Sequence, residues 1–195
     1  VNGVATRTGP WLWNPNLANP NLVGGSSGSG YDPSRLGGNM WTNRQGQWTG
    51  TEPGAYINST AAYRTEAGHD VVYITAETYA QGWPILYKYT LGNAGELDKW
   101  EAIGANSFQG QAFAGAGTID TQHNLFVRTS TGGDAYDILV WNLTGATAAS
   151  PTFSQSVKLQ YGDGSAFVMD AGFGMDYDSA NGNFYAWNGT AIYAF

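Results

Sequence analysis

The segment 176–189, DYDSANGNFYAWNG, crowds aspartate, asparagine and glycine together in a way that could coordinate calcium. An EF-hand loop needs oxygen ligands at set positions, a glycine at position 6 and a glutamate at position 12. Counted from Asp176, position 6 is Asn181 and position 12 is Trp187, so the pattern does not fit. The same residues are typical of a hairpin turn in which Asp178 accepts backbone hydrogen bonds. We therefore expect a β-hairpin and no metal site here.

Nucleophilic or metal chemistry has few other candidates. The chain has no cysteine, so disulfides, thiolate zinc sites and a cysteine nucleophile are excluded. The two histidines, His69 and His123, stand 54 residues apart in turn-like segments. Duplication of one turn would produce that spacing, which favours a structural role over a metal-binding or general-base role. The sequence indicates no cofactor and no metal.

Paired carboxylates could hydrolyse a glycosidic bond if they lay roughly 5 to 10 Å apart in one cleft. Three pairs are close in sequence: Asp134 with Asp137, Asp98 with Glu101, and Asp163 with Asp170. All of them fall in connections or at strand starts, where aspartate is common because it stabilises turns. A non-catalytic role is therefore favoured, and an enzyme that acts on polysaccharide through these acids is the alternative.

The chain has more aromatic side chains than a few small sheets need for packing. Seven of them form this surplus: Trp41, Trp83, Trp141, Trp187, Tyr79, Tyr136 and Tyr161. Aromatic rings beside polar acceptors can bind sugars by stacking and hydrogen bonding, and loops clustered on one rim make a binding face. The predicted ligand-binding residues lie in two loops that follow equivalent strands: Tyr79, Gln81, Trp83, Asp134 and Tyr136. Packing between sheets is the alternative role for these rings.

The strands that position these loops recur with one spacing. Tyr73 in VVYIT and Phe126 in NLFVR are 53 residues apart, and the following strands PILYKY and DILVWN keep that interval. Trp100 and Phe153 share it, so three landmarks agree. Each unit reads as a small-residue strand, a turn, two apolar strands joined by a hairpin, and an aromatic-anchored strand. Four antiparallel strands in about 50 residues predict one blade of a β-propeller.

A further copy of this unit begins late in the chain, where NFYAW at 183–187 matches NLFVR. The first strand of each unit is rich in small residues, which fits a crowded innermost position where the blades converge. These residues are Ala112, Ala114, Ala116, Ala171, Gly172 and Gly174.

This order of strands is similar to the kelch and galactose-oxidase-type propeller pattern over about residues 40–195. In that family an aromatic residue opens the outer strand, and Trp48, Trp100 and Phe153 stand at that point here. The family's paired glycine after the second strand is missing, and its copper site would need a cysteine. The last unit also resembles a hemopexin-type repeat, which implies a four-bladed propeller, although the usual closing cysteines are absent.

We therefore predict an all-β fold, a β-propeller of about four blades in a single domain over residues 1–195. Its expected parts are an irregular N-terminal strand or arm with a weak first blade at 1–48 and repeat units at 49–105, 106–158 and 159–195. The strand containing Trp11 and Trp13 is expected to seal the ring. An open part-propeller that assembles through its blade edges is the alternative.

Composition limits the class of partner. A net charge of −7 with only eight Lys and Arg argues against binding to nucleic acid. No apolar run approaches the roughly 20 residues of a membrane helix. Low lysine with abundant Thr, Asn, Gly and Trp suits a secreted, extracellular protein. The sequence thus favours a non-catalytic module that binds glycans or a cell-surface or extracellular protein, with a polysaccharide-acting enzyme or a self-assembling structural subunit as alternatives.

Overall fold

The computed structural model describes residues 11–13, 41–43, 48–53, 59–77, 84–93, 95–105, 115–129, 137–165, 167, 174–187 and 190–195. Within these residues the secondary structure consists of strands joined by turns and bends, with no helix. The prediction of an all-β fold is confirmed. The same residues contain no helix that could cross a membrane. The chain divides into two compact units, Val1–Thr49 with Gly92–Lys99 and Gly50–Leu91 with Trp100–Phe195.

The first unit contains a short two-stranded sheet. Strand β1 (Trp11–Trp13) pairs antiparallel with β2 (Trp41–Asn43), and Leu12 lies opposite Thr42. Such pairing satisfies backbone N–H and C=O groups of both short strands. The sequence predicts that the strand with Trp11 and Trp13 seals a ring. Among the described strands its partner is β2, and the sealing of a ring stays a prediction.

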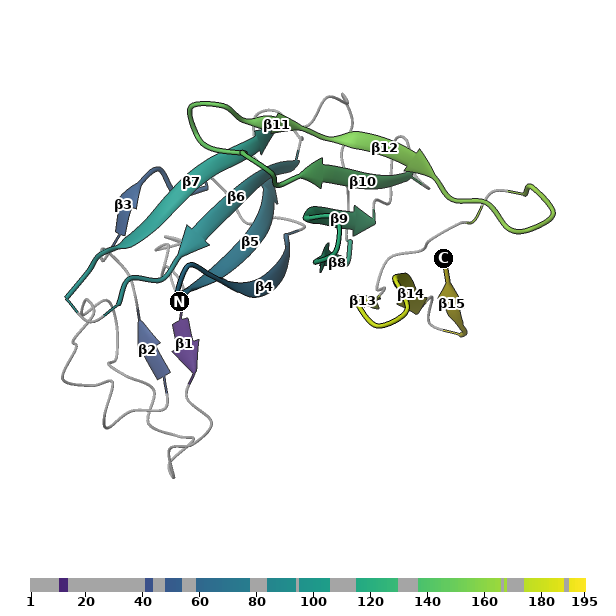
Figure 1. Ribbon diagram of the computed structural model, residues 1–195, viewed down its shortest axis with the longest axis horizontal. Coiled ribbons are helices and arrows are strands. Elements are labelled where there is room, and N and C mark those ends of the chain that lie inside the picture. Colours follow the sequence, from purple (N-terminus) through teal and green to yellow (C-terminus); the bar gives the residue numbers. More distant parts are fainter. Residues whose placement is uncertain are drawn as a thin grey trace, which may run out of the picture. The chain divides into compact units, whose positions relative to one another are not determined.

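The largest sheet has six strands, and four of them are consecutive and lie in the order of the chain (Figure 1). Each strand is joined to the next by a short turn or loop, which places sequence neighbours side by side. Strand β3 (Trp48–Gly50) also pairs with the last of the four. The four strands are β4 (Thr60–Glu66), β5 (His69–Glu77), β6 (Pro84–Thr90) and β7 (Asp98–Ala105).

Two further sheets follow, each running through its strands in chain order. The second sheet contains β8 (Gly117–Asp120), β9 (Leu125–Thr129), β10 (Asp137–Asn142) and β12 (Gln155–Lys158). The third sheet contains β13 (Gly174–Asp178), β14 (Asn183–Trp187) and β15 (Ile192–Ala194). In the connection from β10 to β12, β11 (Thr152–Phe153) pairs parallel with β7 of the first sheet. The predicted hairpin in 176–189 is confirmed, because β13 and β14 pair antiparallel.

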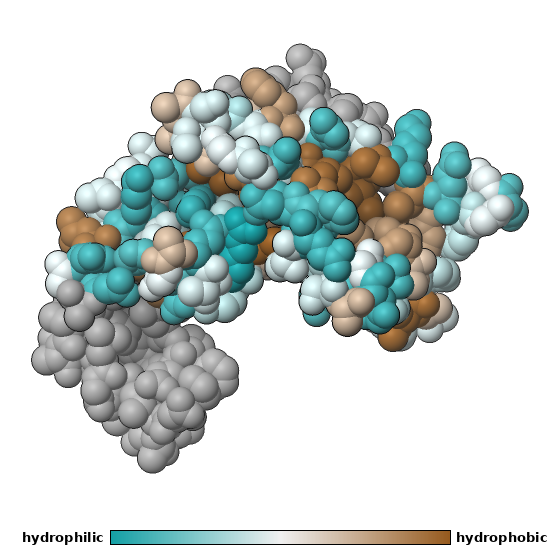
Figure 2. Space-filling view, viewed as in Figure 1, coloured by the Kyte–Doolittle hydropathy of each residue, from teal (hydrophilic) through white to brown (hydrophobic). Residues whose placement is uncertain are grey.

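The main core lies between the first and second sheets. Tyr73 on β5 and Phe126 on β9 are both buried, and their ring centroids are 6.5 Å apart. Trp141 on β10 packs against Phe126 and donates a hydrogen bond from Nε1 to the Ala105 carbonyl at 3.0 Å. Figure 2 shows hydrophilic residues over much of the visible face, with hydrophobic side chains set between them. Side chains alternate between the two faces of a strand, so the buried rings lie on the faces that the first and second sheets turn toward each other.

The opposite face of the first sheet carries its own aromatic group. Trp100 on β7 is buried, 4.5 Å from the ring of Tyr89 and edge-on to Tyr87. Gly50 on β3 has a φ of +83° and comes so close to the Trp100 backbone that a Cβ would lie 2.0 Å from its carbonyl oxygen. Only glycine fits this approach, which lets β3 pair with β7.

Trp100 and Phe153 do not occupy equivalent places, although their 53-residue spacing predicts it. Trp100 is 1% exposed, whereas Phe153 is 63% exposed. Phe153 lies on β11 opposite Ala105, and Ser154 donates from its backbone N–H to the Ala105 carbonyl before β12 begins. Phe153 stands where the chain crosses between two sheets, so no sheet face covers its ring.

The small residues of the first strands have different surroundings. Ala116 is buried just before β8, which agrees with a crowded innermost position. Gly174 on β13 is exposed, and a Cβ added there would meet no atom within 4 Å, which disagrees with such a position. The remaining four predicted residues lie outside the described part of the chain: Ala112, Ala114, Ala171 and Gly172.

Candidate functional site

The five predicted ligand-binding residues all lie outside the described residues: Tyr79, Gln81, Trp83, Asp134 and Tyr136. The loops that carry them follow β5 and β9, as the sequence predicts, because β5 ends at Glu77 and β9 ends at Thr129. Their role as a binding surface therefore stays a prediction.

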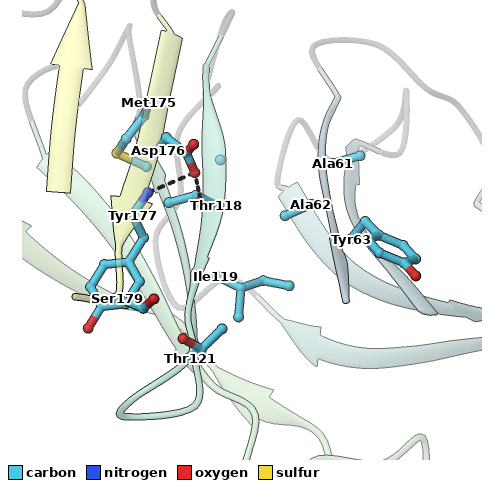
Figure 3. A pocket seen from close by; sticks show the side chains of 11 residues that line it. Ala61, Ala62, Tyr63, Thr118, Ile119, Thr121, Met175, Asp176, Tyr177 and Ser179 are labelled. Atoms are coloured by element: carbon cyan, nitrogen blue, oxygen red, sulfur yellow. Dashed lines mark hydrogen bonds between the residues drawn. The ribbon is translucent and has the colours of Figure 1, made fainter. Parts of the chain in front are cut away.

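The structure shows a different site, where the first strands of the three sheets meet. A cavity of about 340 Å³ is lined by residues from β4, β8 and β13 and from the turns after β8 and β13. Figure 3 shows the β8 and β13 side chains on one side of it and the β4 side chains on the other. The lining residues are Ala61, Ala62, Tyr63, Gly117, Thr118, Ile119, Thr121, Met175, Asp176, Tyr177 and Ser179.

Close approach of two sheets at Gly117 helps to form this cavity. A Cβ at Gly117 would lie 2.8 Å from Cγ2 of Thr60 and 3.0 Å from Cζ of Phe126. Strand β8 therefore lies against β4 on one side, and it also contacts β13. Ala61 and Ala62 on β4 add only small side chains, which leaves room between the three strands.

The polar centre of the cavity is the carboxylate of Asp176. Its Oδ1 accepts a hydrogen bond from the Thr118 hydroxyl at 3.3 Å and from the Tyr177 backbone N–H at 2.8 Å (Figure 3). Thr118 and Asp176 come from neighbouring sheets, so this contact joins β8 to β13. No described lining residue is basic, so the carboxylate faces the cavity without a cationic partner there.

Tyr63 supplies an aromatic ring at the β4 wall. Its side chain is 61% exposed, although its hydroxyl donates to Oδ1 of Asp70 at 2.6 Å and lies 3.0 Å from the Thr65 hydroxyl. These contacts fix the ring while leaving its surface accessible. On the β13 wall, burial and then the neighbouring Asp120 carboxylate raise the pKa of the Tyr177 phenol, which keeps it neutral.

Asp120 closes the turn between β8 and β9. Oδ1 accepts the backbone N–H groups of Gln122 and His123 at 2.9 and 3.0 Å, and Oδ2 lies 2.7 Å from the Nδ1 atom of His123. Asn124 then has a φ of +57°, which the last turn position requires and asparagine tolerates. Burial raises the pKa of Asp120, but the hydrogen bonds from His123 and Gln122 outweigh it and hold the pKa below its usual range.

Asp178 closes the turn between β13 and β14 in the same way. Oδ1 accepts the Ala180 backbone N–H at 2.9 Å, Oδ2 accepts the Asn181 side-chain amide at 2.5 Å, and Gly182 has a φ of +72°. The Asn181 side chain, followed by the Ala180 backbone, lowers the pKa of Asp178. The predicted Asx-type turn is confirmed, and both carboxylate oxygens accept hydrogen bonds within it.

A network of hydrogen-bonded polar side chains lies between the first and second sheets, outside the cavity. The Glu66 carboxylate accepts hydrogen bonds from Tyr73, Arg64 and Lys88, and Arg64 also donates to Oδ1 of Asn124 at 2.5 Å. Burial raises the pKa of Glu66, but the bonds from Lys88, Tyr73 and Arg64 bring it below its usual value. Burial and then Glu66 raise the pKa of Tyr73. This network fastens β4, β5 and β6 to the Asn124 turn.

The described candidates for acid–base chemistry serve local structure. Asp98 is buried and accepts the Gly92 backbone N–H at 2.8 Å, and Asp163 accepts both the backbone N–H and the hydroxyl of Ser165. His69 places Nδ1 3.2 Å from the Leu91 carbonyl oxygen. Asp134 and Asp170 lie outside the described residues, so two of the three candidate acid pairs are not tested.

The surplus aromatic residues divide into two groups where the structure describes them. Trp141 is buried against Phe126, so the packing role is right for it. Trp187 on β14 is 44% exposed, and Tyr161, after β12, is 39% exposed. These two rings remain available for contact with a ligand.

The sequence does not predict Thr118, Asp176 and Tyr63 as site residues. Asp176 stands in the sequence as part of a turn, and nothing local distinguishes Thr118 from other strand threonines. Their one shared feature is position, because each belongs to the first strand of its sheet. A search for polar residues on those strands would have found them.

Among the described residues, no group of three or more His, Cys, Asp or Glu is placed to hold a metal ion. Comparison of the chain with family models, curated proteins and solved structures finds no match.

Proposed function

We propose that this chain is a non-catalytic binding domain whose cavity between β4, β8 and β13 takes a neutral, hydroxyl-rich ligand such as one saccharide unit. One observation carries the proposal. Three sheets contribute their first strands to a single cavity that combines a carboxylate, hydroxyl groups and an accessible aromatic ring.

The chemistry of the walls fits such a ligand. Asp176 can accept hydrogen bonds from two hydroxyls, and Thr118 and Ser179 can donate or accept at neighbouring positions. Tyr63 offers its exposed ring to the C–H face of a sugar. An anionic ligand is disfavoured, because the cavity is lined by the carboxyl group of Asp176 and by no described basic residue.

Hydrolysis is disfavoured by the same set of side chains. A glycosidase of the common type places two carboxyl groups on either side of the bond to be broken. Asp176 is the one carboxylate among the described residues that line the cavity. A second acid at suitable distance is what the enzyme alternative would require.

The arrangement of strands supports a propeller-type fold for this domain. Each of the three sheets runs through its strands in chain order, and the first and second sheets pack face to face. The first strands converge on one cavity, as the inner strands of propeller blades do. The matching turns at Asp120 and Asp178 add a further likeness.

Binding is tested on a panel of monosaccharides and short glycans, followed by calorimetry on any ligand found. Asp176→Asn and Tyr63→Ala should each weaken binding by about tenfold or more, since a hydrogen bond to a charged group is worth roughly 1.5–3 kcal/mol. Phe153→Ala and Asp163→Asn are matched controls, because they remove an equally exposed ring and an exposed carboxylate elsewhere. Both controls should bind as the native chain does.

A separate variant distinguishes the cavity from the loops predicted by sequence. If Trp83→Ala abolishes glycan binding while Asp176→Asn leaves it unchanged, the ligand occupies the loops and the cavity proposal is wrong. Turnover of a polysaccharide by the native chain would contradict the non-catalytic part of the proposal. Failure of every glycan tested to bind would contradict the ligand class.

The propeller arrangement has its own test. The absence of native cysteine allows spin labels to be placed at Ala61→Cys and Ser179→Cys without background labelling. Both positions are exposed and line the cavity from different sheets. A narrow distribution of distances between the labels is expected if first strands are held around one axis. A broad distribution would contradict that arrangement.

A further inference from the structure

We propose that a second cavity, between residues 159–162 with Phe167 on one side and the β15 end of the chain on the other, binds a small organic cation that carries a methylated ammonium group. This cavity has a volume of about 170 Å³ and is separate from the cavity between the first strands. Half of its described lining residues are aromatic: Tyr161, Phe167, Tyr193 and Phe195.

Hydrogen bonds within residues 159–165, and between Leu159 and Phe167, hold these residues in shape. The Phe167 backbone N–H donates to the Leu159 carbonyl at 3.0 Å, and the Tyr161 backbone N–H donates to the Ser165 carbonyl at 2.8 Å. Inside this loop, Asp163 accepts the backbone N–H and the hydroxyl of Ser165 at 2.9 and 2.6 Å. The loop therefore presents Tyr161 and Phe167 together, and Phe167 packs into a small core with Ala186.

Three rings meet at steep angles in this cavity. Phe167 and Tyr193 are 4.7 Å apart with an interplanar angle of 77°, and Tyr161 is inclined by 60° to Phe167 and by 68° to Tyr193. Because these contacts are edge to face, the three ring planes stand at steep angles to one another and form a corner rather than a flat platform. A corner of aromatic faces suits a compact, rounded group, and a cation is attracted to the negative face of each ring.

The charge around the cavity points to the same ligand. None of the described lining residues is basic. Burial, then the Tyr193 hydroxyl, and finally the negative charge of Asp163 raise the pKa of the Tyr161 phenol. Tyr161 therefore stays neutral near pH 7, and the Asp163 carboxylate beside it favours a positive ligand.

A saccharide fits this cavity less well than the first one. Gln160 is the one described lining residue with a side-chain amide, and the described lining contains no carboxylate. A sugar would lose many hydrogen bonds to water and regain few. A methylated ammonium group donates few or no hydrogen bonds, so it loses less on entering. This site is independent of the glycan site, and either can be right without the other.

The test compares choline with its neutral isostere 3,3-dimethylbutan-1-ol, both titrated into the full chain and followed by nuclear magnetic resonance. Choline should bind in the millimolar range and at least about tenfold more tightly than the alcohol, because the two differ only in charge. Equal binding of both compounds would overturn the proposal, since the cavity would then be merely apolar. Failure of choline to shift any resonance would overturn it as well.

Variants locate the site. Tyr161→Leu should weaken choline binding by about tenfold, whereas Tyr161→Phe keeps the ring and should stay within about twofold of the native chain. Tyr185→Leu is the matched control, because Tyr185 is 37% exposed and lies outside the cavity. Asp163→Asn should weaken choline binding by a few fold and reduce its dependence on salt. Unchanged binding in Tyr161→Leu, with the fold intact by circular dichroism, would place the cation elsewhere.

Discussion

Trp141 and Trp187 both stand at or near the end of a strand, but their environments in the fold are opposite. Trp141 lies near the end of β10 and is fully buried, with Phe126 beside it and its Nε1 bonded to the Ala105 carbonyl. Trp187 is the last residue of β14 and is 44% exposed. The first sheet covers the face of the second sheet that carries Trp141. Among the described residues, the face carrying Trp187 has no comparable cover.

The difference shows that a tryptophan contributes to stability only through what packs on it. The aromatic surplus of this chain is therefore two populations. One population builds the contact between sheets, and the other remains at the surface where a ligand can reach it. Variants that remove one member from each population test this division.

The largest expected effect belongs to Trp141→Ala. Removing a fully buried indole leaves a cavity between the two sheets and should lower the free energy of unfolding by about 3–5 kcal/mol. Trp187→Ala should change the free energy of unfolding by less than about 0.5 kcal/mol, because its ring is half exposed. Urea denaturation followed by circular dichroism measures both. Equal losses in the two variants would show that Trp187 is covered after all.

A smaller effect is expected at the glycine beneath Trp141. A Cβ at Gly104 would lie 2.8 Å from Cδ1 of Trp141 and 2.9 Å from Cβ of Leu86. Gly104→Ala should therefore cost about 1–3 kcal/mol through overpacking. The matched control is Gly174→Ala in the third sheet, where an added Cβ would have no other atom within 4 Å. That variant should be neutral or slightly stabilising, and a loss as large as that of Gly104→Ala would contradict the open environment of Gly174.

The smallest effect separates the two matching turns and depends on pH. Because hydrogen bonds hold the pKa of Asp120 below its usual value, its contribution to stability is complete above the unfolded pKa of about 3.9 and is lost as pH falls through the folded pKa. Asp120→Asn should lower the free energy of unfolding by about 1 kcal/mol at pH 7. The stability of this variant should fall less than that of the native chain between about pH 5 and pH 2. Asp178→Asn should show the same direction with a smaller change, because Asp178 is more exposed. Thermal melts across this pH range test both variants. A larger loss of stability in Asp178→Asn than in Asp120→Asn would contradict the expected ranking of the two turns.

Part of the structure was predictable from short stretches of sequence. The hairpin around Asp178 and the Asp120 turn follow from aspartates that accept backbone hydrogen bonds two residues later, which is a local interaction. The burial of Tyr73 and Phe126 follows from apolar alternation in their strands. The exposure of Phe153 could not be predicted in this way, because it depends on where the chain leaves the pairing of β11 with β7 and enters β12.

The sequence by itself determined that this chain forms strands, where several of them turn, and that its aspartates serve those turns, because these outcomes depend on alternation and on contacts a few residues long. Tertiary structure decided which faces of the sheets are covered, and so which aromatic rings are buried. It also decided that Tyr63, Thr118 and Asp176, which are far apart in the sequence, share one cavity. Such meetings depend on how separate sheets approach, and no local pattern encodes that approach.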